Sequence, residues 1–288
     1  MLLLVLGASR WVLASTHPEA TSTATSGFLG AGWASVLSFL VFRMRISKLP
    51  TNQHAVGNSL RLLVAGAMLF GGASCALIFR PSDLNAAGFS IAMSLTPMVI
   101  SVASSVRNET AYEGITGRIW PSLAAVVGLL LLFAQPALAD VRSDLTYLFA
   151  PILTGTGAVL FGVGPHRAEV RVALSLAGGC LFFAVSLAVA MFFGNPFQAI
   201  SIVTVASDGL LILLSVVSLI QVGPSKWSAQ FILVPLLIVL EGIILVHPRL
   251  TAQVIVGLIL LAASSVSLLL SKVDEQDESS YRDLTLNR

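Results

Sequence analysis

Charged side chains are scarce in this sequence. They make up 10% of its 288 residues, whereas about 25% is usual for a soluble domain. Hydrophobic residues account for 56%, and the mean hydropathy is +0.91. A water-facing surface is therefore excluded over most of the chain, and a net charge of +2 gives no reason to expect nucleic acid. We expect an all-α integral membrane protein with the lipid bilayer as its main partner.

Residues that carry chemistry are also scarce. The two cysteines, Cys75 and Cys180, lie inside apolar runs, and the four histidines are far apart in predicted loops. No metal-ligand spacing, nucleotide-binding glycine loop or nucleophile elbow is present in the sequence. We therefore expect no metal, no cofactor and no enzymatic activity.

Apolar runs long enough to cross a bilayer repeat from end to end, since a spanning helix takes roughly 17–25 residues. We predict ten transmembrane helices as two inverted five-helix repeats, 1–140 and 141–271, followed by a disordered cytoplasmic tail, 272–288. The predicted spans are 1–15, 26–42, 62–79, 85–106, 119–135, 145–163, 172–193, 199–221, 228–246 and 251–271.

Orientation follows from the basic residues of the loops. Alternate loops and the tail carry 12 of the 16 Lys and Arg residues, and the opposite loops carry 3. The larger group includes Arg61 and Arg171, which we assign to cytoplasmic loops. This asymmetry predicts a multi-pass protein of the cell membrane with both termini cytoplasmic. The first run, 1–15, could instead be a signal peptide, but it lacks a basic start and carries Arg10 in its middle.

The chain resembles itself at half-length. The fourth predicted span and the ninth each have a proline early in an apolar run, and a hinge arginine and a glycine-bearing span follow each of them. These matches pair Pro97 with Pro235, Arg118 with Arg249, and Gly128 with Gly257. Because each half would hold an odd number of spans, the second half would enter the membrane from the opposite side, as in many secondary transporters.

The C-terminal stretch "IQVGPSKWSAQFILVPLLIVLEGIILVHPRLTAQVIVGLILLAAS" resembles EamA-like members of the drug/metabolite transporter superfamily. The residues that carry the resemblance are Pro235, Arg249, Leu250, Thr251 and Gly257, with a weaker copy at Pro97 and Gly128. Pro248 and Val234 stand where the family usually has glutamates, so the chain looks like a divergent member. The resemblance implies ten spans and secondary transport.

Three ionisable residues fall inside predicted spans: Arg10, Asp208 and Glu241. A central Arg or Asp costs roughly 2.5–3.5 kcal/mol to insert, so such residues usually face the bundle interior. Two acids and one base leave at least one carboxylate to become a proton carrier, although an ion pair that only fixes helix register is the alternative. Asp208 is nearest a span centre, whereas Glu241 could snorkel to the outer face.

The fourth predicted span adds a face of small hydroxyls. Ser94 and Ser101 belong to a series, with Ser90, Pro97 and Ser104, whose spacing places all five on one helical face. Such a face lines a wet pathway or lets another helix pack closely. Pro97 and Pro235 each free a carbonyl and permit a kink that could act as a hinge. Trp120 and Trp227 are expected to anchor span ends in the interface.

The sequence thus favours a secondary transporter of a small metabolite, with export the preferred direction, alternating access about a central cavity and proton coupling. An alternative is a membrane-embedded accessory or scaffold protein with a transporter-like fold, or a subunit acting on lipid-linked substrates. A homodimer is compatible with either function. The substrate and the coupling ion are not readable from the sequence.

Overall fold

The computed structural model of the chain describes residues 23–46, 53–79, 86–107, 112–133, 145–162, 168–192, 202–246 and 251–270. In these ranges the regular structure is entirely α-helical, because backbone in lipid must satisfy its own N–H and C=O groups within each segment. The helices are α2 (Thr23–Ile46), α3 (Gln53–Phe79), α4 (Ala86–Met93), α5 (Thr96–Arg107), α6 (Tyr112–Phe133), α7 (Leu145–Phe161), α8 (Ala168–Phe192), α9 (Ile202–Ser228), α10 (Gln230–Val246) and α11 (Ala252–Leu270). The predicted all-α class is confirmed for this part of the chain.

The described helices fall on the predicted spans from 26–42 onward, and the first span, 1–15, and the tail, 272–288, lie outside the described residues. Two details differ. The predicted span 85–106 is divided into α4 and α5 at Ser94 and Leu95. Helix α9 continues past the predicted end of its span, but Gly223 interrupts it with φ 76° and ψ 163°.

Among the described residues, three segments are long and apolar enough to cross a membrane. They are Val170–Val189 in α8, Val205–Ser228 in α9 and Ala252–Leu270 in α11. Shorter apolar stretches of 10–17 described residues occur in α2, α5, α6, α7 and α10. The chain is therefore compatible with a membrane protein.

Many large apolar side chains are exposed, and many small hydroxyl side chains are buried. Large apolar residues point outward along α2, α8 and α11, for example Leu40, Leu181 and Ile259. Small hydroxyl residues are buried between helices: Ser35, Ser38, Ser94, Thr96, Ser101, Ser122, Thr154, Ser175, Ser186, Ser225, Ser228, Ser264 and Ser265. Exposed large apolar side chains are a liability in water and suit lipid tails, and small interior residues suit close helix packing in a bilayer.

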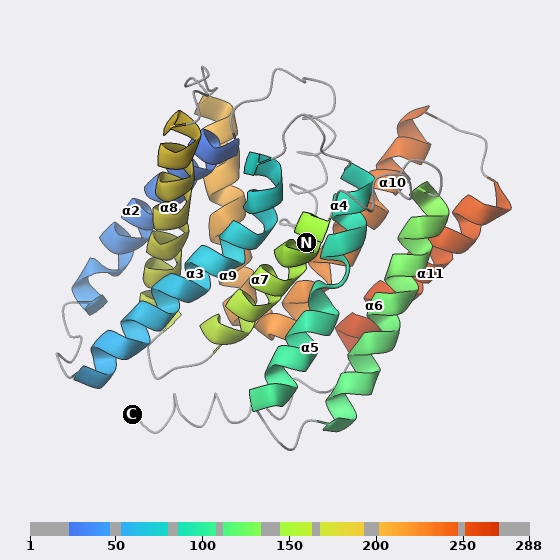
Figure 1. Ribbon diagram of the computed structural model, residues 1–288, viewed down its shortest axis with the longest axis horizontal. Coiled ribbons are helices and arrows are strands. Elements are labelled where there is room, and N and C mark those ends of the chain that lie inside the picture. Colours follow the sequence, from blue (N-terminus) through green and yellow to red (C-terminus); the bar gives the residue numbers. More distant parts are fainter. Residues whose placement is uncertain are drawn as a thin grey trace.

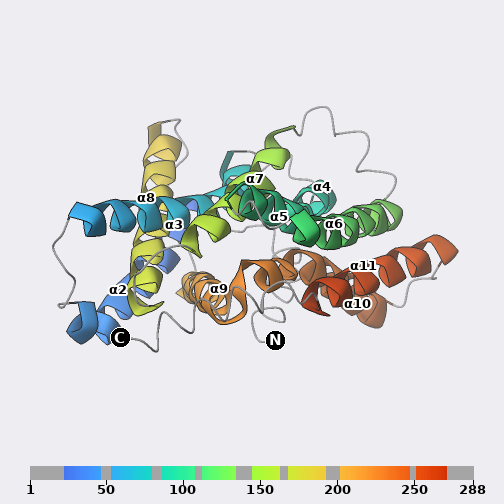
Figure 2. The same cartoon turned by 90° about the horizontal axis from the view of Figure 1, so that it is seen from below.

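The helices form two groups joined by α5 and α7. Figure 1 shows α2, α3, α8 and α9 on one side and α4, α6, α10 and α11 on the other. The second view shows α9, α10 and α11 in one row, with α3, α7, α5 and α6 in a row above it (Figure 2). The most extensive packing is between α3 and α7, α2 and α8, α3 and α8, α6 and α11, and α2 and α9.

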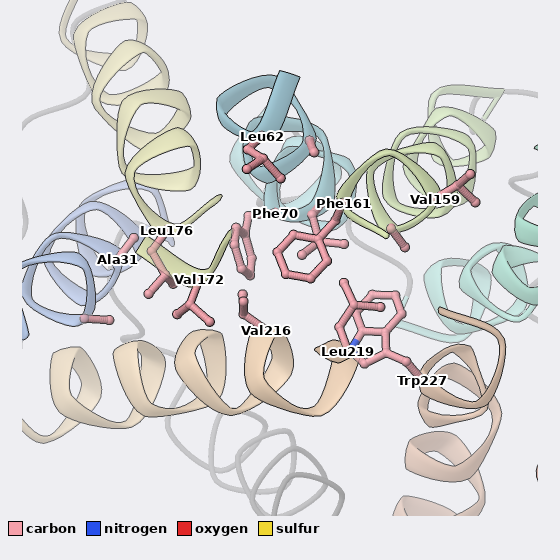
Figure 3. Packing of buried hydrophobic residues seen from close by; sticks show 14 of the residues in the cluster. Ala31, Leu62, Phe70, Val159, Phe161, Val172, Leu176, Val216, Leu219 and Trp227 are labelled. Carbon is pink, nitrogen blue, oxygen red and sulfur yellow. The ribbon is translucent and has the colours of Figure 1, made fainter. Parts of the chain in front are cut away.

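The larger hydrophobic core lies in the group that contains α2, α3, α8 and α9. Leu62 and Phe70 of α3, Phe161 of α7, and Val216 and Leu219 of α9 meet there (Figure 3). A smaller cluster joins α6, α10 and α11 through Ala125, Leu129, Ile232, Leu236, Leu261 and Leu268. The two cores give each group of helices its own packed centre.

At the crossing of α3 with α7, a Cβ added to Gly72 would lie 2.5 Å from the Ala150 oxygen, and one added to Gly157 would lie 2.6 Å from the Leu69 nitrogen. Three further helix crossings are also close enough to require glycine. A Cβ added to Gly66 of α3 would lie 1.9 Å from the carbonyl oxygen of Ser175, and one added to Gly178 of α8 would lie 2.0 Å from that of Leu63. Between α6 and α11, a Cβ on Gly128 would lie 2.9 Å from the Gly257 oxygen, and one on Gly257 would lie 2.8 Å from the Gly128 oxygen. The third crossing, between α2 and α9, contains the candidate site.

Candidate functional site

Asp208 is a carboxylate inside the bundle. It lies on α9, its residue is 4% exposed, and fewer than two helical turns separate it from Ile202, where the helix begins. The prediction that it faces the interior is confirmed. Its position near the centre of a span remains a prediction.

Helix α2 approaches α9 at the position of Asp208. A Cβ added to Gly30 would lie 2.8 Å from the backbone nitrogen of Gly209 and 3.1 Å from the Cβ of Asp208. A Cβ added to Gly209 would in turn lie 2.6 Å from the Gly30 oxygen. Because neither glycine carries a side chain, the backbone of α2 covers the turn of α9 that holds the carboxylate.

Trp33 completes this crossing. Its indole Nε1 donates a hydrogen bond to the carbonyl oxygen of Val205, at 3.1 Å. A Cβ on Gly209 would lie 2.3 Å from the same indole ring, so the glycine makes room for the tryptophan. Sequence reasoning did not select Trp33, although the run "GAGW" contains the signal, because a tryptophan three residues after Gly30 lies on the same helical face.

The hydroxyls of the α4–α5 region bind the backbone around the break. Ser94 Oγ donates to the Ile91 oxygen at 2.7 Å, and Thr96 Oγ1 donates to the Met93 oxygen at 2.7 Å. Met93 O is the carbonyl that the missing N–H of Pro97 would otherwise have bound. The amides of Ser94 and Leu95 donate to Ser90 O and Ala92 O, at 3.1 and 3.0 Å. The four last carbonyls of α4 therefore have donors without any contribution from water.

Ser101 follows the same pattern on α5. It is buried, and its Oγ donates to the Pro97 oxygen at 2.9 Å. Ser94 is also fully buried. On the other side of α5, a Cβ added to Gly155 of α7 would lie 2.8 Å from Val99, so this region packs closely. A pathway role for Ser94 and Ser101, and a hinge role for Pro97, remain predictions.

Glu241 lies in a different neighbourhood from Asp208. It is half-buried near the C-terminal end of α10, between the exposed side chains of Leu240 and Ile244. Figures 1 and 2 show α10 and α2 on opposite sides of the bundle. The structure therefore does not bring the two acids together. Pro235 is buried inside an uninterrupted α10, and its hinge role also remains a prediction.

Six arginines that were expected in loops or hinges lie inside described helices: Arg43, Arg45, Arg61, Arg107, Arg118 and Arg171. Arg10 lies outside the described part of the chain. Arg61 and Arg171 are corrected from loop to helix, since they lie in α3 and α8 with their Nε atoms buried. The guanidinium carbon of Arg171 lies 4.9 Å from the centre of the Phe161 ring, which is cation–π geometry.

The two tryptophans that were expected to anchor span ends differ. Trp120 is 72% exposed on α6, as interfacial anchoring requires. Trp227 is 4% exposed and belongs to the core, where its Nε1 donates to the Ser215 oxygen at 3.0 Å and its ring meets Phe231 edge-on. The anchoring prediction is wrong for Trp227, because the turn at Gly223 and Pro224 folds it back onto α9.

Among the described side chains, no three His, Cys, Asp or Glu residues gather as a metal site would require. The polar groups of the region are one buried carboxylate, an indole N–H and backbone carbonyls.

Comparison with known proteins gives the fold alone. No protein-family model matches the sequence, and no curated protein matches it. Chains of solved structures do match in three dimensions. One of them, described only as the crystal structure of a protein, superposes with a TM-score of 0.65 over 93% of this chain and 94% of its own, at 14% sequence identity. The helical arrangement is thus shared with a solved protein over nearly the whole length.

Proposed function

We propose that the chain is a secondary transporter of a small metabolite, with ten spans in two inverted five-helix repeats and a carboxylate, Asp208, as its proton-binding group. Export from the cytoplasm is the proposed direction, across the cell membrane with both termini cytoplasmic. The observation that carries the proposal is a buried carboxylate at a glycine-lined helix crossing inside a bundle with an apolar exterior. Buried acids in membrane helices typically mark ion or substrate pathways.

The pairing of helices supports the inverted repeat. If the two halves correspond, α2 matches α8, α3 matches α9, and α6 matches α11. The crossing of α3 with α8 at Gly66 and Gly178 then corresponds to the crossing of α9 with α2 at Gly209 and Gly30. A two-fold relation between the halves would produce this repetition, and packed hydrophobic residues alone would not require it.

The contact between α6 and α11 supports the same relation. Gly128 and Gly257 are the glycines that the sequence pairs with each other, and each meets the carbonyl oxygen of the other at nearly equal distances. A residue pair that lies on a two-fold axis makes such reciprocal contacts. The likeness to EamA-like transporters, carried by Pro235, Arg249, Leu250, Thr251 and Gly257, agrees with this architecture.

Asp208 provides the chemical basis. A carboxyl group can bind and release a proton, and so alternate between a charged and an uncharged form. Its place on α9, under the backbone of α2, puts it where a shift of one helix would change its access to water. Proton binding and helix movement would then be coupled, as alternating access requires.

The test uses proteoliposomes that hold the purified protein and a trapped pH-sensitive dye. A panel of amino acids, nucleosides, sugars and hydrophobic cations is added against a pH gradient, and the internal pH is followed. We expect at least one compound to move protons through the wild-type chain. Asp208→Asn should abolish that response, because the amide cannot bind and release a proton.

Glu241→Gln is the matched control, since it makes the same change at a half-buried acid near the end of α10. It should retain most of the response. Full activity of Asp208→Asn would remove this carboxylate from the mechanism. No proton movement with any compound, together with no counterflow of the same compounds, would favour the scaffold alternative.

A further inference from the structure

The crossing of α2 and α9 contains a side-chain contact that the transport proposal does not use. We infer that Trp33 is the positioning residue of the Asp208 site: it fastens α2 to the backbone of α9 and so keeps the carboxylate covered. The inference rests on the proposed function for its biological meaning. Its structural content, that the Trp33 indole helps to hold α2 against α9 over Asp208, can be tested without any transported substrate.

The hydrogen bond from Trp33 is placed to act on Asp208. Its acceptor, Val205 O, belongs to the residue three positions before Asp208 on α9. In an α-helix this carbonyl also accepts the N–H of residue 209, and a carbonyl oxygen has two lone pairs to serve both donors. The indole therefore adds an interhelical hydrogen bond to the turn of α9 that carries the Asp208 carboxylate.

At the glycine pair itself no side chains interlock. Gly30 and Gly209 meet backbone to backbone and present no side chains to each other. Interlocking side chains usually fix the register of two packed helices, and glycines provide none. The Trp33 ring packs into the space left by Gly209, and its indole N–H donates the hydrogen bond between the two helices.

Movement of α2 would uncover Asp208. The backbone of Gly30 lies directly over it, since a Cβ there would come within 3.1 Å of the Asp208 Cβ. Separation of α2 from α9 would therefore open a route to this side chain from one membrane face. Loss of the Trp33 hydrogen bond should raise the open population, and an interhelical hydrogen bond in a membrane protein corresponds to about a threefold change in such an equilibrium.

The experiment measures access to position 208. Asp208→Cys is made in a chain that lacks native cysteines (Cys75→Ser and Cys180→Ser) and is reconstituted in lipid vesicles. A membrane-impermeant maleimide is added from each side in turn, and the labelling rate is recorded. Trp33→Phe keeps an aromatic ring and removes the donor, so it should raise labelling from one side about threefold. Trp33→Ala, which also removes the ring, should raise it further.

Two controls separate opening of α2 from general loosening. Trp120→Phe makes the same chemical change on the exposed face of α6, and it should leave the rate unchanged. Ser264→Cys places a thiol at a buried position of α11, away from α2, and its labelling should not respond to Trp33→Phe. If Asp208→Cys fails to fold, the native Cys180 in a Cys75→Ser chain replaces it, since its Sγ lies 3.8 Å from the Cβ position of Gly32 on α2.

Equal labelling of position 208 in the wild-type and Trp33→Phe backgrounds would overturn the inference. A parallel rise at Ser264→Cys, or equal rises from both membrane faces, would also overturn it, because global loosening would then explain the result. The proposed function fails separately. A one-sided increase in labelling in a chain that moves no compound of the panel would keep the positioning role of Trp33 and remove transport.

Discussion

The two proline-bearing segments that the sequence pairs with each other fold differently. The first is broken beside Pro97, where α4 ends at Met93 and α5 begins at Thr96. The second, α10, runs without interruption from Gln230 to Val246 with Pro235 inside it. A proline in an apolar run therefore does not decide by itself whether a helix breaks. Its neighbours decide what happens to the carbonyl that the proline leaves without an N–H.

The neighbours differ in hydroxyl content. When Pro97 is aligned with Pro235, the positions of Ser94, Thr96 and Ser101 correspond to Ile232, Val234 and Val239. The hydroxyls of the first segment donate to Ile91 O, Met93 O and Pro97 O. Serine and threonine thus offer the backbone an alternative to the helical ladder, whereas the branched apolar side chains of α10 offer none.

The second segment has its irregularity earlier in the chain. Gly223 has φ 76° and ψ 163°, and Pro224 follows it. At Ala229 the amide donates to Lys226 O, and Ile232 N donates to Ala229 O, both at 3.1 Å and both over three residues. The break near Pro97 is thus maintained by side-chain hydrogen bonds, and the one before Pro235 by a glycine conformation.

The largest expected effect in this comparison is at Gly223. Gly223→Ala should lower the free energy of unfolding by about 1–3 kcal/mol, because this backbone conformation is nearly exclusive to glycine. No atom lies within 4 Å of the added Cβ, so the cost is conformational and not steric. The midpoint of an unfolding titration in detergent micelles measures it.

Gly57→Ala is the control for that change. Gly57 lies in α3 with nothing within 4 Å of an added Cβ and without a positive φ. This substitution should stabilise the helix by up to about 1 kcal/mol. An equal loss of stability at both glycines would contradict the conformational explanation. The break before Pro235 could then not be assigned to the backbone conformation of Gly223.

The sequence predicted the positions of the helices well, because long apolar runs bounded by turn residues are a strong signal in a chain with so few charges. It also paired Gly128 with Gly257, and the structure brings them into contact. It did not predict that the span 85–106 would divide. That division depends on hydroxyl groups reaching specific carbonyls, and a hydropathy pattern contains no information about such bonds.

The candidate site was predicted only in part. Asp208 was selected because an acid in an apolar run is costly, and it is indeed buried. Trp33 was passed over, since a tryptophan in a span reads as an interfacial anchor until its neighbours are known. Trp227 was misread for the same reason. Which side chains meet across helices depends on crossing geometry, and single-sequence patterns do not determine it.

An intermediate effect is expected where the hydroxyls are exchanged between the two segments. Thr96→Val removes the donor to Met93 O and leaves a buried carbonyl without that bond, which should cost about 1–2 kcal/mol. Val234→Thr places a hydroxyl before Pro235, where it can reach the carbonyl three residues earlier, and should change stability by less than about 1 kcal/mol. Unfolding midpoints of the two variants test this, and a larger effect at Val234 would reverse the assigned cause of the break.

The smallest effects are expected at the prolines themselves, and they should have opposite signs. Pro97→Ala should lower stability by about 0.4–1 kcal/mol, because Thr96 already occupies Met93 O and the loosened unfolded chain gains entropy. Pro235→Ala restores an N–H inside an unbroken helix and should raise stability by up to about 1 kcal/mol. Both are read as shifts in the unfolding midpoint. If Pro97→Ala were instead the stabilising change, the proline would be the cause of the helix break. The hydrogen bonds of the hydroxyl groups would then be its consequence.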